Sequence, residues 1–230
     1  MQTIGILGGM SWESTQSYYA AINQGIKRQL GGLHSAKIVL YSVDFAEIEA
    51  LQQSGDWQNA GEMLGHAALS LQNAGADFLL IATNTMHKVA PAIEAQLQIP
   101  LLHITDATAA ELKQQSVTRV GLLGTAFTME QAFYRERLQA HGIEVLTPPA
   151  EERDEVHRII FAELCLGEIR DASRERFLQI IQTLAERGAQ GVILGCTEIG
   201  LLVQQTDTSV PLYDTTAIHA SAAVNKALAS

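Results

Sequence analysis

Three landmarks occur twice in this sequence, in the same order and at nearly constant separation. The paired segments are residues 5–9 and 121–125, residues 75–83 and 188–196, and residues 100–106 and 211–216. Their starts are 116, 113 and 111 residues apart. A repeat this long exceeds the period of a solenoid. The sequence therefore predicts two similar domains that arose by internal duplication.

The two halves also alternate between short apolar runs and longer helical patterns. Residues 3–9, 36–43 and 77–82 are typical of buried strands, whereas residues 63–73 place apolar side chains at helical spacing, with Gly75 as a stop. Repeated alternation of this kind indicates an α/β fold, with a mostly parallel sheet flanked by helices. We expect two pseudo-symmetric domains of this class.

The proline-led segments suggest where the domains begin and end. Each follows the second landmark strand of its own half, and the simplest arrangement lets each cross to the other domain's sheet. This predicts a first domain of residues 1–100 plus 210–230 and a second of residues 101–209, with a helix at 217–228 closing the first. Ligands of parallel sheets bind beyond the carboxyl ends of the strands. We therefore expect the active site in a cleft between the two domains.

Composition narrows the class of protein. The 230 residues include 15 Lys and Arg against 25 Asp and Glu, a net charge of −10, which argues against a nucleic-acid-binding protein. No apolar run approaches the roughly 18 residues of a membrane helix, and the amino terminus lacks the pattern of a secretory signal. Two cysteines do not make a disulfide framework. We expect a cytoplasmic enzyme with reduced thiols and no membrane partner.

The residues at the ends of the repeated strands suggest chemistry. The repeat makes Thr83 equivalent to Cys196, and facing domains would present these side chains to a ligand from opposite sides. Inversion of a tetrahedral carbon needs this geometry, since one group removes a proton and another supplies one on the far face. A thiol has a pKa of about 8.5, which a helix N-terminus can lower. Asn84, Thr85 and Thr197 are natural donors to a substrate carboxylate.

Three motifs carry a resemblance to a known family. Gly8-Gly9-Met10, the segment Thr83-Asn84-Thr85-Met86-His87 and the segment Gly195-Cys196-Thr197-Glu198 resemble the signatures of the aspartate/glutamate racemase superfamily, in the right order along the whole chain. The resemblance implies two duplicated α/β domains, a homodimer and a small amino-acid substrate. It also implies catalysis without pyridoxal phosphate or any other cofactor, by two cysteines on opposite faces of the substrate. Met10 would line the cleft.

This chain departs from the family at two positions. Thr83 stands where the family has a cysteine, and a hydroxyl has no accessible anion near neutral pH. Because the resemblance associates the second cysteine with the L enantiomer, we expect Cys196 to deprotonate L-aspartate or L-glutamate and Thr83 to return the proton inefficiently. Gln52 lies near where a basic residue for a distal carboxylate is expected, and residues 163–168 also lack a base. A broader substrate range follows.

Other interpretations stay open at this point. Arylmalonate decarboxylases resemble the same superfamily and keep only the second cysteine, and an amino-acid sensor could retain the cleft without catalysis. Cys165 belongs to an apolar helical pattern and is expected in the core. His87 more readily makes a local bond or helps to bind substrate than acts as a base. Glu198 either orients Cys196 or caps its helix, and the histidines show no metal-binding spacing.

Overall fold

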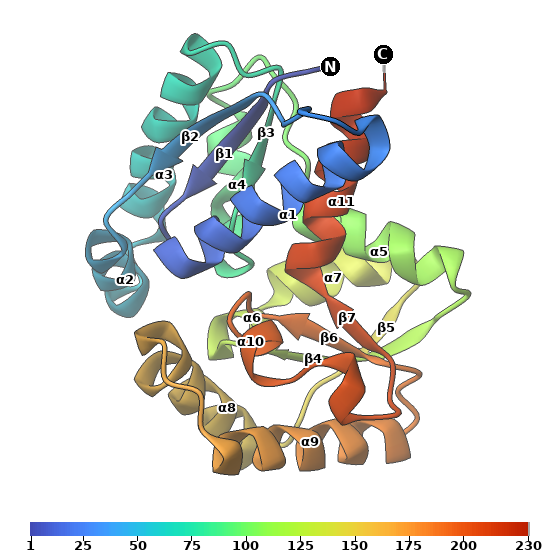
Figure 1. The fold of residues 1–230 in the computed structure, drawn as a ribbon. Coiled ribbons are helices and arrows are strands. Elements are labelled where there is room, and N and C mark those ends of the chain that lie inside the picture. Colours follow the sequence, from blue (N-terminus) through green and yellow to red (C-terminus); the bar gives the residue numbers. More distant parts are fainter. Residues whose placement is uncertain (230) are drawn as a thin grey trace. The chain divides into compact units, whose positions relative to one another are not determined.

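The computed structural model describes residues 1–229 (Figure 1). The strands are β1 (Ile4–Gly8), β2 (Ile38–Ser42), β3 (Phe78–Ile81), β4 (Arg119–Gly124), β5 (Glu144–Leu146), β6 (Val192–Gly195) and β7 (Leu212–Asp214). The α-helices are α1 (Trp12–Leu30), α2 (Phe45–Ser54), α3 (Trp57–Asn73), α4 (Ala90–Glu94), α5 (Ile104–Gln114), α6 (Ala126–Glu130), α7 (Ala132–Ala140), α8 (Ala150–Ala162), α9 (Asp171–Glu186), α10 (Ile199–Leu202) and α11 (Thr215–Leu228). Short 3₁₀ helices are η1 (Thr85–Val89), η2 (Leu164–Leu166) and η3 (Gln205–Asp207).

The chain divides into two compact units. Unit 1 comprises Met1–Ile104 together with the chain from His219 onward, and unit 2 comprises Thr105–Ile218. The polypeptide therefore passes from one unit to the other twice, near the start of α5 and within α11. Each unit contains its own parallel sheet, as expected for a duplicated α/β chain.

Unit 1 is built on a parallel sheet of order β2-β1-β3. Helices cover both faces, as buried parallel strands require. On one face, the side chains of Leu7, Leu79 and Ile81 pack against α3 and α4. On the other face, strand side chains including Ile6 and Leu80 pack against α1 and the unit 1 part of α11, and Figure 1 shows these two helices beside each other.

Unit 2 has a parallel sheet of order β5-β4-β6-β7. Helices α8 and α9 contact β4, and α7 contacts β5. Tyr134 of α7 and Phe177 of α9 are fully buried, as are apolar residues of β4 and β6. The order β2-β1-β3 of unit 1 corresponds to the order β5-β4-β6 of unit 2, which agrees with the duplication read from the sequence.

The prediction that the proline-led segments cross to the opposite sheet is wrong. The carbonyl of Pro100 accepts from the backbone N–H of Leu79 at 2.9 Å, and Leu101 forms a parallel bridge with Leu79 in the unit 1 sheet. The carbonyl of Pro211 accepts from Val192 at 2.8 Å, and β7 pairs with β6 in unit 2. A proline at the start of an edge strand loses only a donor that the ladder does not need. Each segment therefore extends its own sheet, and the chain changes unit after it.

Most predicted elements are present with small shifts at their ends. The strands predicted at residues 3–9, 36–43 and 77–82 are β1, β2 and β3. The helix predicted at 63–73 starts earlier, at Trp57, because the Asp56 side chain caps it by accepting from the N–H of Asn59. Within residues 1–229, no helix combines the length and the apolar character needed to cross a membrane.

Gly9 supports the turn that follows β1. Its φ is +91°, and a Cβ built on it would lie 2.3 Å from the carbonyl oxygen of Val43. We expect Gly9→Ala to lower the free energy of unfolding by about 3 kcal/mol, because strain and overpacking add. Gly55→Ala is the control, since Gly55 also has a left-handed backbone but no atom lies within 4 Å of its Cβ position. This substitution should lower the free energy of unfolding by about 1 kcal/mol. Denaturant unfolding of both variants tests this; equal losses would contradict it.

His219 is fully buried in unit 1 and bonded through both ring nitrogens. The hydroxyl of Tyr18 lies 2.8 Å from Nδ1, and Nε2 lies 2.8 Å from the carbonyl oxygen of Leu102. Because a carbonyl only accepts, Nε2 carries the proton and Nδ1 accepts from Tyr18. The ring is therefore neutral, and burial lowers the pKa of His219 to about 4.

This depressed pKa predicts a loss of stability in mild acid. The unfolded chain takes up a proton near pH 6.5 and the folded chain only near pH 4. The folded state is thus progressively destabilised as the pH falls between these values, by about 3 kcal/mol in all. We expect His219→Gln to flatten the dependence of the free energy of unfolding on pH in this window. Replacing the exposed His34 should leave that dependence unchanged; an unaltered slope in His219→Gln would refute the assignment.

Candidate active site

Thr83 lies just beyond the carboxyl end of β3 and is half-buried. The register pairs Ile81 at the end of β3 with Leu7 of β1, so the turns after these two strands share one edge of the sheet. The hydroxyl of Ser14, in the first turn of α1, donates to the carbonyl of Ala82 at 3.1 Å. The start of α1 is therefore fixed directly beside the Thr83 turn.

Four other predicted site residues gather at this edge of unit 1. Asn84 and Thr85 continue the chain from Thr83 into η1, and both are buried. Gln52 of α2 is also buried, and its Nε2 donates to the sulfur of Met86 in η1 at 2.9 Å. Met10 belongs to the same buried apolar cluster as Met86. The fold thus brings five of the predicted site residues to this edge: Met10, Gln52, Thr83, Asn84 and Thr85. A thioether is a weak acceptor, so the Gln52 amide is held by a bond that a stronger acceptor can replace.

His87 is only 2% exposed, and both of its ring nitrogens bond the backbone. Its Nδ1 lies 2.8 Å from the carbonyl oxygen of Thr83, and its Nε2 accepts from the backbone N–H of Ile104 at 3.2 Å. The carbonyl requires a proton on Nδ1, and the N–H requires a lone pair on Nε2. With both nitrogens engaged, the ring has the local bonding role that the sequence favoured over that of a base.

Cys196 follows the last residue of β6 and is 8% exposed. Its thiol donates to Oε2 of Glu198 at 2.9 Å, and the hydroxyl of Thr197 donates to the same oxygen at 2.7 Å. Glu198 is 4% exposed and occupies the N-cap position of α10, but its side chain makes no capping bond. The choice left open by the sequence is thus decided, because the carboxylate holds the thiol and does not cap the helix.

The pKa of the Cys196 thiol is raised well above its ordinary value. Burial is the largest cause, and the negative charge of Glu198 adds to it. Both effects disfavour the thiolate, since its charge is desolvated and faces another anion. This direction is opposite to the lowering that a helix N-terminus can give, and in the protein without ligand the thiol is protonated and Glu198 accepts its hydrogen bond.

Replacing Glu198 by Gln tests this electrostatic arrangement. Removing the negative charge should lower the pKa of Cys196 toward its ordinary range, although burial still holds it up. We expect the thiolate absorbance of Glu198→Gln to appear at lower pH than in the wild type, after subtraction of a Cys196→Ala blank for Cys165. Glu163→Gln is the matched control, because Glu163 is a buried carboxylate of the same unit that bonds Ser173. An equal shift in both variants would contradict the account.

Cys165 is not part of the apolar helix in which the sequence placed it. Helix α8 ends at Ala162, and Cys165 lies in η2, half-buried. The apolar spacing continues past the helix end, but Gly167 with φ of +76° reverses the chain there. Its thiol also raises the pKa of Cys196, but less than burial and the charge of Glu198 do.

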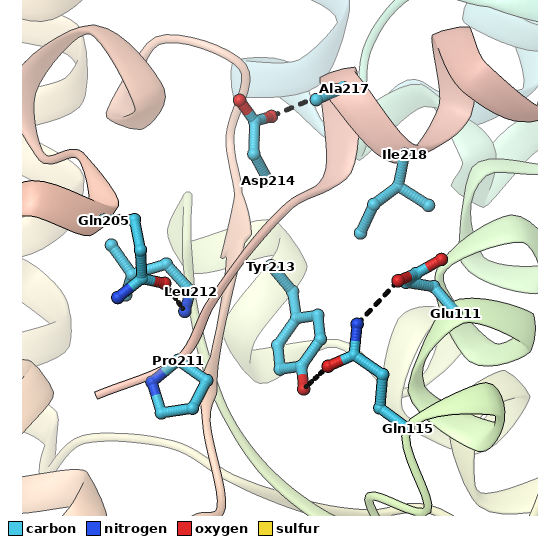
Figure 2. A pocket seen from close by; sticks show the side chains of 9 residues that line it. All are labelled: Glu111, Gln115, Gln205, Pro211, Leu212, Tyr213, Asp214, Ala217 and Ile218. Carbon is cyan, nitrogen blue, oxygen red and sulfur yellow. Dashed lines mark hydrogen bonds between the residues drawn. The ribbon is translucent and has the colours of Figure 1, made fainter. Parts of the chain in front are cut away.

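Unit 2 also has a pocket of about 340 Å³ beside β7 (Figure 2). Its residues are Glu111, Gln115, Gln205, Pro211, Leu212, Tyr213, Asp214, Ala217 and Ile218. Tyr213 donates to the side chain of Gln115, which donates to Glu111. None of the predicted site residues lines this pocket. Among residues 1–229, no group of histidine, cysteine or acidic side chains is arranged to hold a metal ion.

Comparison with known proteins gives a consistent picture. The profile of the family described as Asp/Glu/Hydantoin racemase matches residues 7–223. The broad specificity amino-acid racemase RacX of Bacillus subtilis (strain 168) is 25% identical over 98% of both chains.

Two solved structures are similar over almost the whole chain. One, from Yersinia pestis and described as a candidate Asp/Glu racemase, is 60% identical with a TM-score of 0.93, covering 99% of this chain and 100% of the other. The other, an aspartate racemase homologue from Pyrococcus horikoshii OT3, is 36% identical with a TM-score of 0.85, covering 99% of each chain. The fold, the order of the motifs and these relatives establish that this chain belongs to the Asp/Glu/hydantoin racemase family of enzymes.

Proposed function

We propose that this enzyme interconverts the enantiomers of acidic amino acids, aspartate and glutamate, without a cofactor, and that it favours the L form. The observation that carries the proposal is the buried Cys196 thiol, which donates to the buried Glu198 carboxylate at the end of β6. A thiol must lose its proton before it can act as a base or nucleophile, and an adjacent carboxylate is a group that can accept this proton. In a racemase family, the corresponding task is to remove a proton from the α-carbon.

The proposed reaction begins when Glu198 accepts the thiol proton and Cys196 becomes a thiolate. The thiolate then takes the α-proton of the L-amino acid, and the electron pair of the broken C–H bond is delocalised into the substrate carboxylate. Return of a solvent-exchanged proton from Cys196 restores the L form. Delivery of a proton from Thr83, directly or through water, on the opposite face gives the D form. Solvent then reprotonates the hydroxyl, and Glu198 releases to solvent the proton that it took from the thiol.

Binding is assigned to polar side chains that follow the strands. We propose that Asn84, Thr85 and Thr197 donate to the α-carboxylate, whose developing negative charge needs fixed donors. Gln52 would leave Met86 and donate to the distal group of the substrate, while Met10 lines the site. Because Gln52 is an uncharged donor, it tolerates groups other than a carboxylate, which supports a range broader than aspartate and glutamate. RacX of B. subtilis is named for broad specificity.

The proposal makes two further assignments. The family resemblance implies a homodimer, and the reduced state that a catalytic thiol needs favours the cytoplasm.

The test is enantiomer analysis after prolonged incubation at high enzyme concentration. We expect D-aspartate and D-glutamate to form from their L enantiomers, as measured by chiral chromatography, with no CO₂ released from an arylmalonate. Failure of both acidic amino acids to interconvert would refute the assignment. Release of CO₂ from the arylmalonate would instead support a decarboxylase, and binding of an amino acid without any α-proton exchange would support a sensor.

A further inference from the structure

His87 bonds the backbone of the Thr83 turn and of the start of α5. Each of its ring nitrogens bonds a backbone group: Nδ1 the carbonyl of Thr83 at 2.8 Å and Nε2 the N–H of Ile104 at 3.2 Å. Ile104 is the first residue of α5, and the N–H groups of a first helical turn have no partner within the helix. The imidazole of His87 therefore bonds both the carbonyl of Thr83, after the end of β3, and the N–H of Ile104, at the start of α5.

The ring is held in one chemical form. With the opposite tautomer, a lone pair would face the Thr83 carbonyl and an N–H would face the Ile104 N–H, so both bonds would be lost. A doubly protonated ring would lose the bond to Ile104. Burial at 2% exposure leaves water no access to repair either loss. The arrangement therefore depends on a neutral imidazole with its proton on Nδ1.

Neighbouring histidines fix the same region of unit 1. The ring of His103 lies with its centroid 4.4 Å from that of His87, and the ring of His219 lies 6.0 Å away. His219 holds the carbonyl of Leu102, two residues before the Ile104 N–H that His87 holds. The segment that carries the chain out of unit 1 is thus bonded by two buried rings, and only one of them also holds Thr83.

We propose that His87 is a positioning residue for the proton return by Thr83, acting through the Thr83 carbonyl and tying this turn to the start of α5. This inference rests on the proposed function, in which Thr83 supplies the proton that produces inversion while Cys196 alone produces exchange. Loss of the Nδ1 bond should therefore reduce inversion more than exchange. Displacement of a reacting group by about 1 Å can cost about 10²-fold.

Two amide variants separate the two bonds. In His87→Asn the amide nitrogen can replace Nδ1 as the donor to Thr83, and in His87→Gln the amide oxygen can replace Nε2 as the acceptor from Ile104. The readout is the ratio of inversion, by chiral chromatography, to α-proton exchange, by NMR in D₂O. We expect His87→Asn to keep this ratio within about threefold and His87→Gln to lower it by about tenfold or more.

His219→Gln is the matched control, because it removes a ring from the same buried cluster but leaves both His87 bonds in place. It should change stability without changing the ratio. Equal ratios in all three variants, or the same fall in His219→Gln as in His87→Gln, would overturn the proposal.

A measurement independent of activity separates this inference from the proposed function. Nitrogen NMR of the wild-type protein should show His87 with a protonated Nδ1 and an unprotonated Nε2. The reverse tautomer or a charged ring at neutral pH would overturn the positioning role even if the enzyme racemises amino acids. The expected tautomer in a protein that exchanges no α-proton would preserve the bonding but refute the proposed function.

Discussion

Replacing Cys196 with alanine is expected to lower α-proton exchange from L-aspartate and L-glutamate by at least about 10²–10⁴-fold, the usual cost of losing a positioned acid or base. The buried thiol is the group that Glu198 contacts, at 2.9 Å, and alanine leaves no atom able to take the proton. Exchange measured by proton NMR in D₂O, alongside thermal unfolding to confirm a folded variant, tests this prediction.

Cys165→Ala provides the matched control for this experiment. Cys165 is the other cysteine of unit 2; it lies in η2, forms no disulfide and is half-buried. Its variant should keep exchange within about threefold of the wild type, well below the loss expected for a catalytic base. If Cys165→Ala lost α-proton exchange and Cys196→Ala kept it, Cys165 would be the residue that removes the α-proton, and the mechanism would be contradicted. Cys196→Ser, which keeps a donor to Glu198, should fold but remain inactive.

Thr83→Cys is expected to produce the largest gain in activity, namely in α-proton exchange from the D enantiomer. The second thiol would supply an acid and base on the far face, where a hydroxyl has no accessible anion near neutral pH. Because the Nδ1 bond of His87 goes to the backbone carbonyl of residue 83, a change of the side chain leaves this bond intact. We expect α-proton exchange from D-aspartate to rise by about 10²-fold or more, with a parallel rise in inversion of the L form.

Thr83→Ser serves as the control, since it retains a hydroxyl at the same position. It should leave exchange from the D enantiomer at the wild-type level. A Thr83→Cys enzyme that exchanges the L form normally yet gains nothing from the D form would show that residue 83 does not face the substrate. The assignment of Cys196 would survive that outcome, whereas the two-face mechanism would not.

The sequence predicted much of the fold because its signals were local. Runs such as residues 77–82 are apolar over the length of a buried strand, and the repeat doubled each such signal. The strand crossing was predicted wrongly because pairing partners are not local. Leu101 joins β3 because the backbone N–H of Leu79 donates to the carbonyl of Pro100. The spacing of apolar residues in the sequence does not indicate such a pairing.

The site was less predictable than the fold for a similar reason. The motifs identified the segments around Thr83 and Cys196, since each follows a repeated strand. The raised pKa of the Cys196 thiol was not predictable, because the burial of the thiol and the approach of Glu198 depend on how the turn after β6 folds. The bond from His87 to Ile104 joins residues that are 17 positions apart, and it could be found only in three dimensions.

The central claim is that one thiol, that of Cys196, removes the α-proton from the L face. The most direct measurement is proton NMR of the α-proton of L-aspartate and of D-aspartate, each incubated with the wild-type enzyme in D₂O. The account predicts that the signal of the L enantiomer disappears while that of the D enantiomer persists far longer. Equal rates of loss from the two enantiomers, or faster loss from the D form, would contradict it.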